Sequence, residues 1–532
     1  MNIGQVRTKA ETQSPYLTDS SCIKTYVGSL ASNPGAARIT THFQNAIDQL
    51  NLEAKVIRTG SFGCFDLEPI VIIDVPDQPA VLYSNASPDG AVELIKGSVQ
   101  GPYGNSRPLC CIGDKKLHDI PLISELQLFN LQNRISLRNC GWIDPEDISH
   151  YILAGRGYTG FSQVLKNNRR DLTDTLLSSA LKGRGDSGCS SADKWKQFAG
   201  TENSDKYLIC NAVDPDPKSW TSRLLLESDP HSVLEGILIS AYFAGASHCF
   251  ICVEENAAAS ERIQRALEQA RTYNLHGSNI LDSEFCCEIE IKETPSSLLT
   301  GYRIELFRCI EENQPLPHML PAFPAIDEIS GKTALMVNPE IMSGVSAVFR
   351  EDIKNSRASK VVTLSGNVNH RYTVEVPHGM TIRDIVDRLG GGVPKGKTIK
   401  AVQLGGLFGV FIAPDDLDLP VDCDAAEESC SNIGSGTIEV MDSGSSILNT
   451  AKDIMKDIQA QSCGKCVFCR EGCLQMLTIL EAISENKRRP QDLDLLIELG
   501  EEMRAESLCA FGRSASNPIL SSLKLFRDEY EI

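Results

Sequence analysis

The sequence lacks any apolar stretch long enough to cross a membrane. Its most apolar stretch, residues 233–253, is interrupted by Glu235 and His248 and is better explained as a helix followed by a strand. The first thirteen residues contain neither the apolar segment nor the cleavage site of a secretory signal. We therefore expect no direct membrane insertion and a cytoplasmic location.

Basic residues are also scarce relative to acidic ones. The chain holds 51 Lys and Arg against 70 Asp and Glu, a formal net charge of −19, and no basic run. Such a chain would be repelled by phosphates, so a nucleic-acid partner is excluded. The nine His are scattered without an HxxH or HExxH pair, which argues against a His-based metal site.

Cysteine, in contrast, is plentiful. In a chain without secretory features, 19 cysteines indicate a reducing compartment, where they serve as metal ligands or small buried hydrophobes. Cys463, Cys466 and Cys469 recur at every third position in "SCGKCVFCREG", and Cys509 follows in "SLCAFG". A triplet can wrap one face of a cubic cluster and a remote thiolate can close it, which predicts a [4Fe–4S] cluster. A structural zinc ion is the less favoured alternative, because zinc is usually bound by two separate CxxC pairs. Cys473 lies outside this set of four, and we expect it to be a buried packing residue.

The length of 532 residues predicts three or four domains, and the patterns indicate an α/β multidomain protein. Residues 1–120 have the order of a thioredoxin-like domain. Residues 125–345 alternate strands and helices, as in a Rossmann-like α/β domain with a parallel sheet. Residues 355–440 place short strands around one helix, as in a β-grasp module, and residues 446–532 form a helical bundle that carries the cluster cysteines.

A glycine-rich loop, "LKGRGDSGCSSADKW", occupies residues 181–195 between a helix and a strand. Small residues let the backbone approach a phosphate, and Arg184 or Lys194 could neutralise its charge. Taken alone, the loop is better explained as an ordinary turn than as a nucleotide-binding site.

Several segments together resemble the NADH-oxidising flavoprotein subunit of respiratory complex I and its soluble relatives in bifurcating hydrogenases and formate dehydrogenases. They include "LRNCGWIDPEDISHYI", "LKGRGDSG", "TIRDIVDRLGGGVPKGKTIKAVQLGG" and the two cysteine segments. The resemblance spans about residues 125–532. Residues 20–100 look like the thioredoxin-like domain that precedes this subunit in the soluble relatives.

The resemblance implies a site for FMN and NADH, a [4Fe–4S] cluster and other subunits of a redox complex as partners. The cluster positions are matched by Cys463, Cys466, Cys469 and Cys509. The flavin positions are matched by Gly183, Arg184, Gly185, Gly188, Lys194, Asn211 and Asn338.

The chain departs from the family pattern mainly at the nucleotide site. The departures are Asp186, Cys189, Val213, Pro215, Tyr302 and Arg303. They remove hydrogen bonds and an aromatic surface, and we expect Tyr302 to intrude on the nicotinamide space. We therefore predict an iron–sulfur electron-transfer or scaffold subunit of a larger oxidoreductase, in which FMN and NAD(H) binding are doubtful and NADH oxidation is lost. The alternatives are a retained FMN site that oxidises NAD(P)H and feeds the cluster, or a zinc-stapled interaction protein.

The N-terminal domain departs as well. Relatives with a [2Fe–2S] cluster there use four cysteines, but Ser61 and Phe65 occupy ligand positions here. Cys64 is out of register, and the upstream segment offers only Cys22. Two thiols cannot complete a Cys₄ site, so we predict a domain without a cluster.

Overall fold

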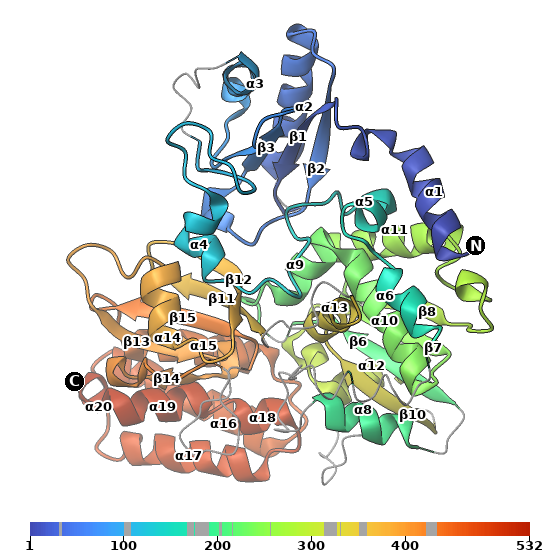
Figure 1. Ribbon diagram of the computed structural model, residues 1–532. Helices are drawn as coiled ribbons and strands as arrows, with labels where there is room; N and C mark the ends of the chain where they lie inside the picture. Colours follow the sequence, from blue (N-terminus) through green and yellow to red (C-terminus); the bar gives the residue numbers. More distant parts are fainter. Residues whose placement is uncertain are drawn as a thin grey trace.

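The computed structural model describes residues 1–30, 34–100, 108–167, 175, 191–201, 205–214, 216–255, 257–312, 327–329, 331–350, 359–421 and 434–531. Within these residues, three five-stranded sheets follow one another along the chain, and a group of helices ends it (Figure 1). The predicted class, an α/β multidomain protein with a helical C-terminal region, is confirmed.

The first sheet has the strand order β2-β1-β3-β4-β5, with β1 and β2 parallel and the other neighbours antiparallel. Its strands are β1 (Ile23–Gly28), β2 (Ala54–Thr59), β3 (Ile70–Asp74), β4 (Val81–Tyr83) and β5 (Cys110–Cys111). Helices α2 (Pro34–Gln49) and α3 (Ala91–Gln100) pack together beside it. Helix α1 (Ile3–Gln13) instead lies against α5 (Ile148–Leu153) of the next domain, as Figure 1 shows.

The second sheet has the order β8-β7-β6-β10-β9, and only β9 is antiparallel to its neighbour. Its strands are β6 (Lys206–Asn211), β7 (His248–Glu254), β8 (Glu288–Thr294), β9 (Asp327–Ile329) and β10 (Lys332–Val337). Its main helices are α8 (Ser191–Ala199), α9 (Thr221–Ser228), α10 (Pro230–Ala244), α11 (Ala258–Thr272), α12 (Arg303–Glu312) and α13 (Pro339–Val348), and α6 (Thr159–Val164) precedes them. Helix α10 is apolar almost all round and nearly fully buried, which explains the apolar run in the sequence.

The third sheet has the β-grasp order β12-β11-β15-β13-β14, with a parallel pair, β11 and β15, at its centre. Its strands are β11 (Ser359–Gly366), β12 (Tyr372–Pro377), β13 (Ile399–Leu404), β14 (Val410–Ile412) and β15 (Thr437–Asp442). The short helix α14 (Ile382–Asp384) continues into one wider turn, η7 (Ile385–Leu389), whose apolar side chains cover the sheet.

The C-terminal region is helical and forms its own hydrophobic core. Its helices are α15 (Ile447–Gln461), α16 (Val467–Ser484), α17 (Asp492–Glu506), α18 (Ala510–Ser514), α19 (Asn517–Leu525) and α20 (Arg527–Tyr530). Helix α19 packs against β14, where the Phe411 amide donates to Ser521 Oγ at 3.0 Å. No helix in the described part of the chain is long and apolar enough to cross a membrane.

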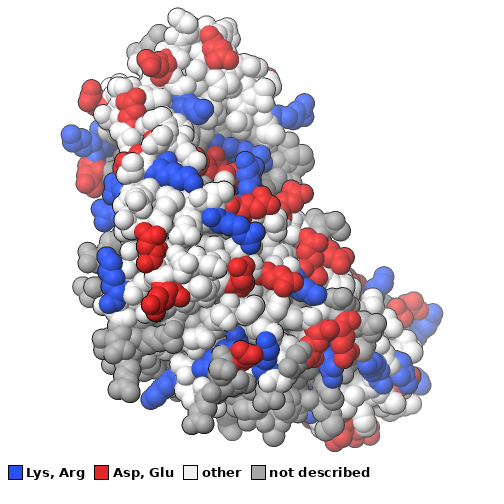
Figure 2. Space-filling model, turned by 90° about the vertical axis from the view of Figure 1, so that its right-hand side faces the viewer, with Lys and Arg blue, Asp and Glu red and all other residues white. Residues whose placement is uncertain are grey.

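Charges of both signs are mixed on one face of the molecule (Figure 2). On the face shown in Figure 2, acidic and basic side chains are interspersed among uncharged ones. The excess of acidic residues is therefore not gathered into one acidic area on that face.

Candidate iron–sulfur and flavin site

Two helix N-termini bring the four predicted cluster cysteines together. Cys463 lies in the turn after α15, and Cys466 is the N-cap residue of α16, which places Cys469 in its first turn. Gly464 has a φ of 74°, a left-handed conformation that lets the chain turn between the first two thiols. Cys509 is the N-cap residue of α18. Partial positive charge at helix N-termini favours the thiolate form that binds metal.

The two helices approach each other closely at this point. A Cβ atom on Gly512 of α18 would lie 2.7 Å from Cβ of Ser507 and 3.2 Å from Cβ of Cys469, so glycine fits here without a shift of these neighbours. Cys463 is exposed, Cys466 is half-buried, and Cys469 and Cys509 are buried. None of the four forms a disulfide.

The positions of the four thiols indicate which kind of metal group they could bind. Among the residues that the structure describes, no three His, Cys, Asp or Glu side chains gather closely enough to hold a metal ion. A donor set of four thiols on two adjoining helix ends suits a four-iron cluster, in which each iron takes one thiolate. The residues present therefore fit a [4Fe–4S] group.

Neighbouring groups adjust the acidity of the thiols. A hydrogen bond from Cys473, with smaller contributions from Ser462 and Cys466, lowers the pKa of Cys469 to about 7. Ser462 Oγ lies 3.4 Å from Cys469 Sγ. Burial raises the pKa of Cys509 to about 12. Cys473 is buried in the helical core, where it both packs and supports a ligand position.

Three aromatic rings from three domains meet beside Cys509. The ring of Tyr302, just before α12, lies 5.7 Å from that of Phe408 in the turn η8 (Gly406–Phe408) and 6.2 Å from that of Phe511 in α18. The rings of Phe408 and Phe511 are 4.9 Å apart. The ring of Tyr302 lies in this contact between the α/β, β-grasp and helical domains, and its intrusion on the nicotinamide space stays a prediction.

Most of the predicted flavin site falls outside the described residues. This applies to Gly183, Arg184, Gly185 and Gly188, to the side chain of Lys194, to the departures Asp186, Cys189 and Pro215, and to the side chain of Arg303. Asn211 and Asn338 are described and lie at the carboxyl ends of the adjacent parallel strands β6 and β10. That edge is where open α/β sheets bind ligands.

The polar atoms of these two asparagines make internal hydrogen bonds. Asn211 Oδ1 accepts from the Val213 amide and Nδ2 donates to the Gly301 carbonyl, both at 3.0 Å. Asn338 Oδ1 caps α13 by accepting from the Ile341 amide at 3.0 Å. Val213 is buried in an apolar cluster with Leu306, Phe307 and Cys309 of α12. The described part of this edge is therefore a packed, hydrogen-bonded framework.

A buried carboxylate that the sequence did not single out ties this edge to the β-grasp domain. Asp216 accepts hydrogen bonds from Ser435 Oγ at 2.8 Å and Thr437 Oγ1 at 2.5 Å. A Cβ on Gly406 would lie 2.0 Å from its Oδ2 atom. No spacing in the sequence links residues so far apart, so only the tertiary structure could reveal this contact.

The N-terminal loop predicted to have lost its cluster is part of a domain interface. Ser61 Oγ donates to Glu68 Oε1, and the ring of Phe65 packs at 5.1 Å from Trp220. A Cβ on Gly60 would lie 2.4 Å from Cβ of Ser228, and one on Gly63 2.1 Å from the Thr373 carbonyl oxygen. The loop is thus held between the α/β and β-grasp domains.

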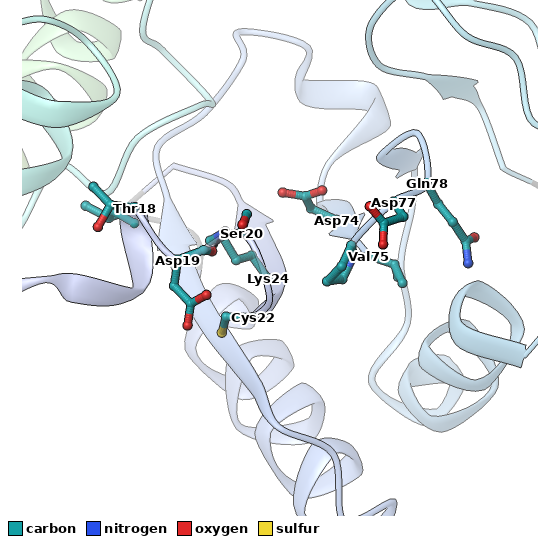
Figure 3. A pocket seen from close by; sticks show the side chains of 11 residues that line it. Thr18, Asp19, Ser20, Cys22, Lys24, Asp74, Val75, Asp77 and Gln78 are labelled. Carbon is teal, nitrogen blue, oxygen red and sulfur yellow. Dashed lines mark hydrogen bonds between the residues drawn. The ribbon is translucent and has the colours of Figure 1, made fainter.

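Cys22 lies far from this loop. It precedes β1, whereas Gly60 adjoins Gly28 at the other end of that strand. A strand of this length spans about 20 Å. Cys22 instead borders an open pocket of about 310 Å³, which Asp19 and Lys24 line on one side and Asp74 and Asp77 on the other (Figure 3). Cys22 and Cys64 therefore cannot bind one cluster in this fold.

The two regions that contain these predicted sites both match known protein families. Residues 449–532 match the family described as NADH-ubiquinone oxidoreductase-F iron-sulfur binding region, and residues 176–342 match the Nuo51 FMN-binding domain. The second range includes the glycine-rich loop. The family resemblance inferred from the sequence is confirmed.

Among similar proteins is the NADP-reducing hydrogenase subunit HndC of Solidesulfovibrio fructosivorans, which is 36% identical over 409 residues, covering 75% of this chain and 83% of the relative. The F subunit of NADH-quinone oxidoreductase from Buchnera aphidicola subsp. Baizongia pistaciae is 30% identical over 390 residues, covering 71% and 88%. The fold is similar to that of a chain in the crystal structure of an NAD⁺-reducing [NiFe]-hydrogenase in the H₂-reduced state (TM-score 0.62, 20% identity, 99% and 89% covered). The chain therefore belongs to the family of NADH dehydrogenase subunits with an FMN-binding domain and an iron–sulfur region, which includes HndC and the F subunits of NADH-quinone oxidoreductases.

Proposed function

We propose that this chain is the electron-input subunit of a multi-subunit oxidoreductase, in which electrons pass from NAD(P)H through FMN to a [4Fe–4S] cluster. The observation that carries the proposal is the contact of Tyr302, Phe408 and Phe511 directly beside Cys509. It joins the FMN-binding region to the cluster region through close packing. The match of residues 176–342 to the FMN-binding family favours this function over the flavin-free relay that the departures in the sequence suggested.

When bound, FMN would accept a hydride and the cluster would carry single electrons. The protein supplies the ligands and their surroundings. Cys463, Cys466, Cys469 and Cys509 would each hold one iron. Ser462 and Cys473 lie against Cys469 Sγ, and hydrogen bonds to ligand sulfur tune the potential of such a centre.

On the flavin side, the glycine-rich loop and the carboxyl ends of β6 and β10 would cradle the cofactor. Gly183, Gly185 and Gly188 would allow the backbone to approach a phosphate, and Arg184 and Lys194 would neutralise it. Asn211 and Asn338 would act mainly by holding this edge of the sheet in shape, because their side chains already bond to the backbone.

A second candidate is an iron–sulfur relay or scaffold without flavin. One observation favours it. Both polar groups of the Asn211 side chain are engaged within the protein, and its neighbour Val213 packs under α12 where the family has a polar residue. In this case a neighbouring subunit would deliver electrons to the cluster.

The partners would be other subunits of the same complex. The relatives are named as subunits of a hydrogenase and of a quinone oxidoreductase, which supports this assignment. The cytoplasmic location, inferred from the high cysteine content, stays a prediction.

The two candidates differ in cofactor content and can be separated on the purified full chain. Prepared anaerobically, it should contain FMN, iron and sulfide, and either NADH or NADPH should bleach the flavin. Cys509→Ala should keep the flavin bleaching and lose the paramagnetic signal of the reduced cluster. Iron and sulfide without flavin would favour the relay, and zinc in place of iron would refute both candidates.

A further inference from the structure

A buried carboxylate, Glu305, lies where the α/β domain meets the helical domain. Glu305 belongs to the first turn of α12 and is 2% exposed. The Leu306 amide donates to the Tyr302 carbonyl at 2.9 Å, so the helical turn includes both residues. Residues three apart lie on the same side of a helix. Glu305 therefore lies on the side of α12 from which the ring of Tyr302 extends.

That side of α12 meets the helical domain beside a predicted cluster ligand. The ring of Tyr302 lies 6.2 Å from that of Phe511, which follows Cys509 by two residues. Burial is the largest cause of the raised pKa of Cys509, and the negative charge of Glu305 raises this pKa further. A carboxylate of the α/β domain thus acts on a thiol of the helical domain.

The surroundings of Glu305 and Cys509 are apolar and closed to water. Cys509 is 3% exposed and Phe511 1% exposed, and the ring of Phe408 packs 4.9 Å from that of Phe511. Charges interact more strongly in such surroundings than in water. The first turn of a helix also favours an ionised carboxylate, because the N-terminal end of a helix is partly positive. We therefore expect Glu305 to carry a negative charge whose field reaches the cluster.

The two ligand segments themselves supply no buried negative charge. Residues 462–470 and 507–516 contain Lys465, Arg470 and Arg513, all exposed, and no acidic residue. The adjoining Glu471 is 45% exposed and bonds to Arg470 at 3.0 Å, so water and this partner weaken its field. The buried carboxylate that acts on Cys509 is therefore contributed by another domain, through Glu305.

We propose that Glu305 sets the reduction potential of the cluster by holding a negative charge beside Cys509. One-electron reduction makes the cluster more negative, and the carboxylate opposes this change, since net charge and burial set the potentials of iron–sulfur clusters. The cluster then takes up an electron less readily and passes it on more readily. Glu305 is not one of the four ligands and acts through the electric field at Cys509. This inference rests on the proposed cluster and is independent of whether FMN is bound.

The test is a redox titration of the full chain, purified anaerobically. Dithionite reduces the cluster stepwise in the presence of mediator dyes, at one pH and one ionic strength. The paramagnetic signal of the reduced cluster, followed against the measured potential, gives the midpoint potential without any need for flavin. Iron and acid-labile sulfide are measured for every variant, and the shape of the signal reports whether the cluster is intact.

Glu305→Gln removes the charge and keeps the size of the side chain. It should increase the equilibrium constant for one-electron reduction roughly tenfold, an upward shift of the midpoint potential of about 59 mV. Glu305→Asp keeps the charge, so its midpoint potential should stay closer to that of the wild type than to that of Glu305→Gln. Glu312→Gln is the matched control on the same helix, because Glu312 is 50% exposed and bonds to Arg308 at 2.6 Å, and it should leave the midpoint potential unchanged.

Four outcomes would overturn the inference. The midpoint potential of Glu305→Gln could equal that of the wild type or lie below it, with the cluster intact. Glu305→Asp could shift the midpoint potential as far as Glu305→Gln does, which would indicate packing in place of charge. Glu312→Gln could produce the same shift, which would indicate an effect of net charge alone. Glu305→Gln could lose its iron, which would assign Glu305 a structural role. A wild-type protein without iron would instead refute the proposed function, and with it this inference.

Discussion

Replacing Gly512 by alanine should lower the iron content of the protein, because this glycine sets the distance between two cluster ligands. An added Cβ would lie 2.7 Å from Cβ of Ser507, 2.8 Å from its Oγ and 3.2 Å from Cβ of Cys469. Contacts this short require a shift of α18 or of the preceding turn. Since Cys509 is the N-cap of α18, its thiol would move away from Cys469.

The size of the effect follows from the crowding. Overpacking of this kind costs about 1–3 kcal/mol. Alanine regains up to about 1 kcal/mol of helix propensity. We therefore expect a net loss of roughly 1–2 kcal/mol, which corresponds to a decrease in cluster affinity of about fivefold to thirtyfold. Iron and acid-labile sulfide per chain, measured after incubation with a chelator, would report this loss.

Gly500→Ala is the matched control in the same domain. Its Cβ would lie 2.7–3.0 Å from the side-chain tip of Leu520, away from the thiols. Both variants should unfold at a lower denaturant concentration, but only Gly512→Ala should release iron faster than the wild type. If Gly512→Ala keeps its iron as well as the wild type does, or if Gly500→Ala loses iron equally, the assignment of Cys509 as the closing ligand through α18 is wrong.

Three further predictions concern the other domains. Ser61→Cys should not create a [2Fe–2S] cluster, because Cys22 lies at the far end of β1, and a two-iron paramagnetic signal in the reduced variant would contradict this. Tyr302→Ala should lower the free energy of unfolding by about 1–3 kcal/mol by removing the aromatic contact between domains, and an unchanged denaturation midpoint would count against that contact. Burial raises the pKa of Glu68 from its ordinary value of 4.5 to about 7. Between these two pH values the folded protein keeps a proton on Glu68 that the unfolded chain releases, so the stability of the folded state falls as the pH rises. The free energy of unfolding of Glu68→Gln minus that of the wild type, measured with urea, should therefore be larger at about pH 8 than at about pH 5, by up to about 3 kcal/mol. If this difference between variant and wild type is the same at both pH values, the assignment is wrong.

Much of the fold could be read from local patterns. Alternating and continuous apolar runs predict strands at β2, β3, β6 and β7, because strand and helix periodicities are properties of short segments. The cysteine spacing likewise predicts the cluster ligands, since three thiols within seven residues are necessarily close in space. The position of Cys466 at a helix N-terminus also follows from the pattern around it.

Contacts between distant segments could be decided only by the tertiary structure. The contact of the Tyr302 ring with Phe408 and Phe511, which lie more than a hundred residues away in the sequence, could not be predicted from the identity of residue 302 alone. The hydrogen bond between Thr437 and Asp216 also joins residues that are far apart in the sequence. Gly60 is a third case, because Ser228 of another domain packs where its side chain would be. The sequence by itself therefore determined the family to which the chain belongs and the cluster that it is predicted to carry. The tertiary packing decided which surfaces bring that chemistry together, because a contact between domains is a property of two surfaces and leaves no periodic signal in either one.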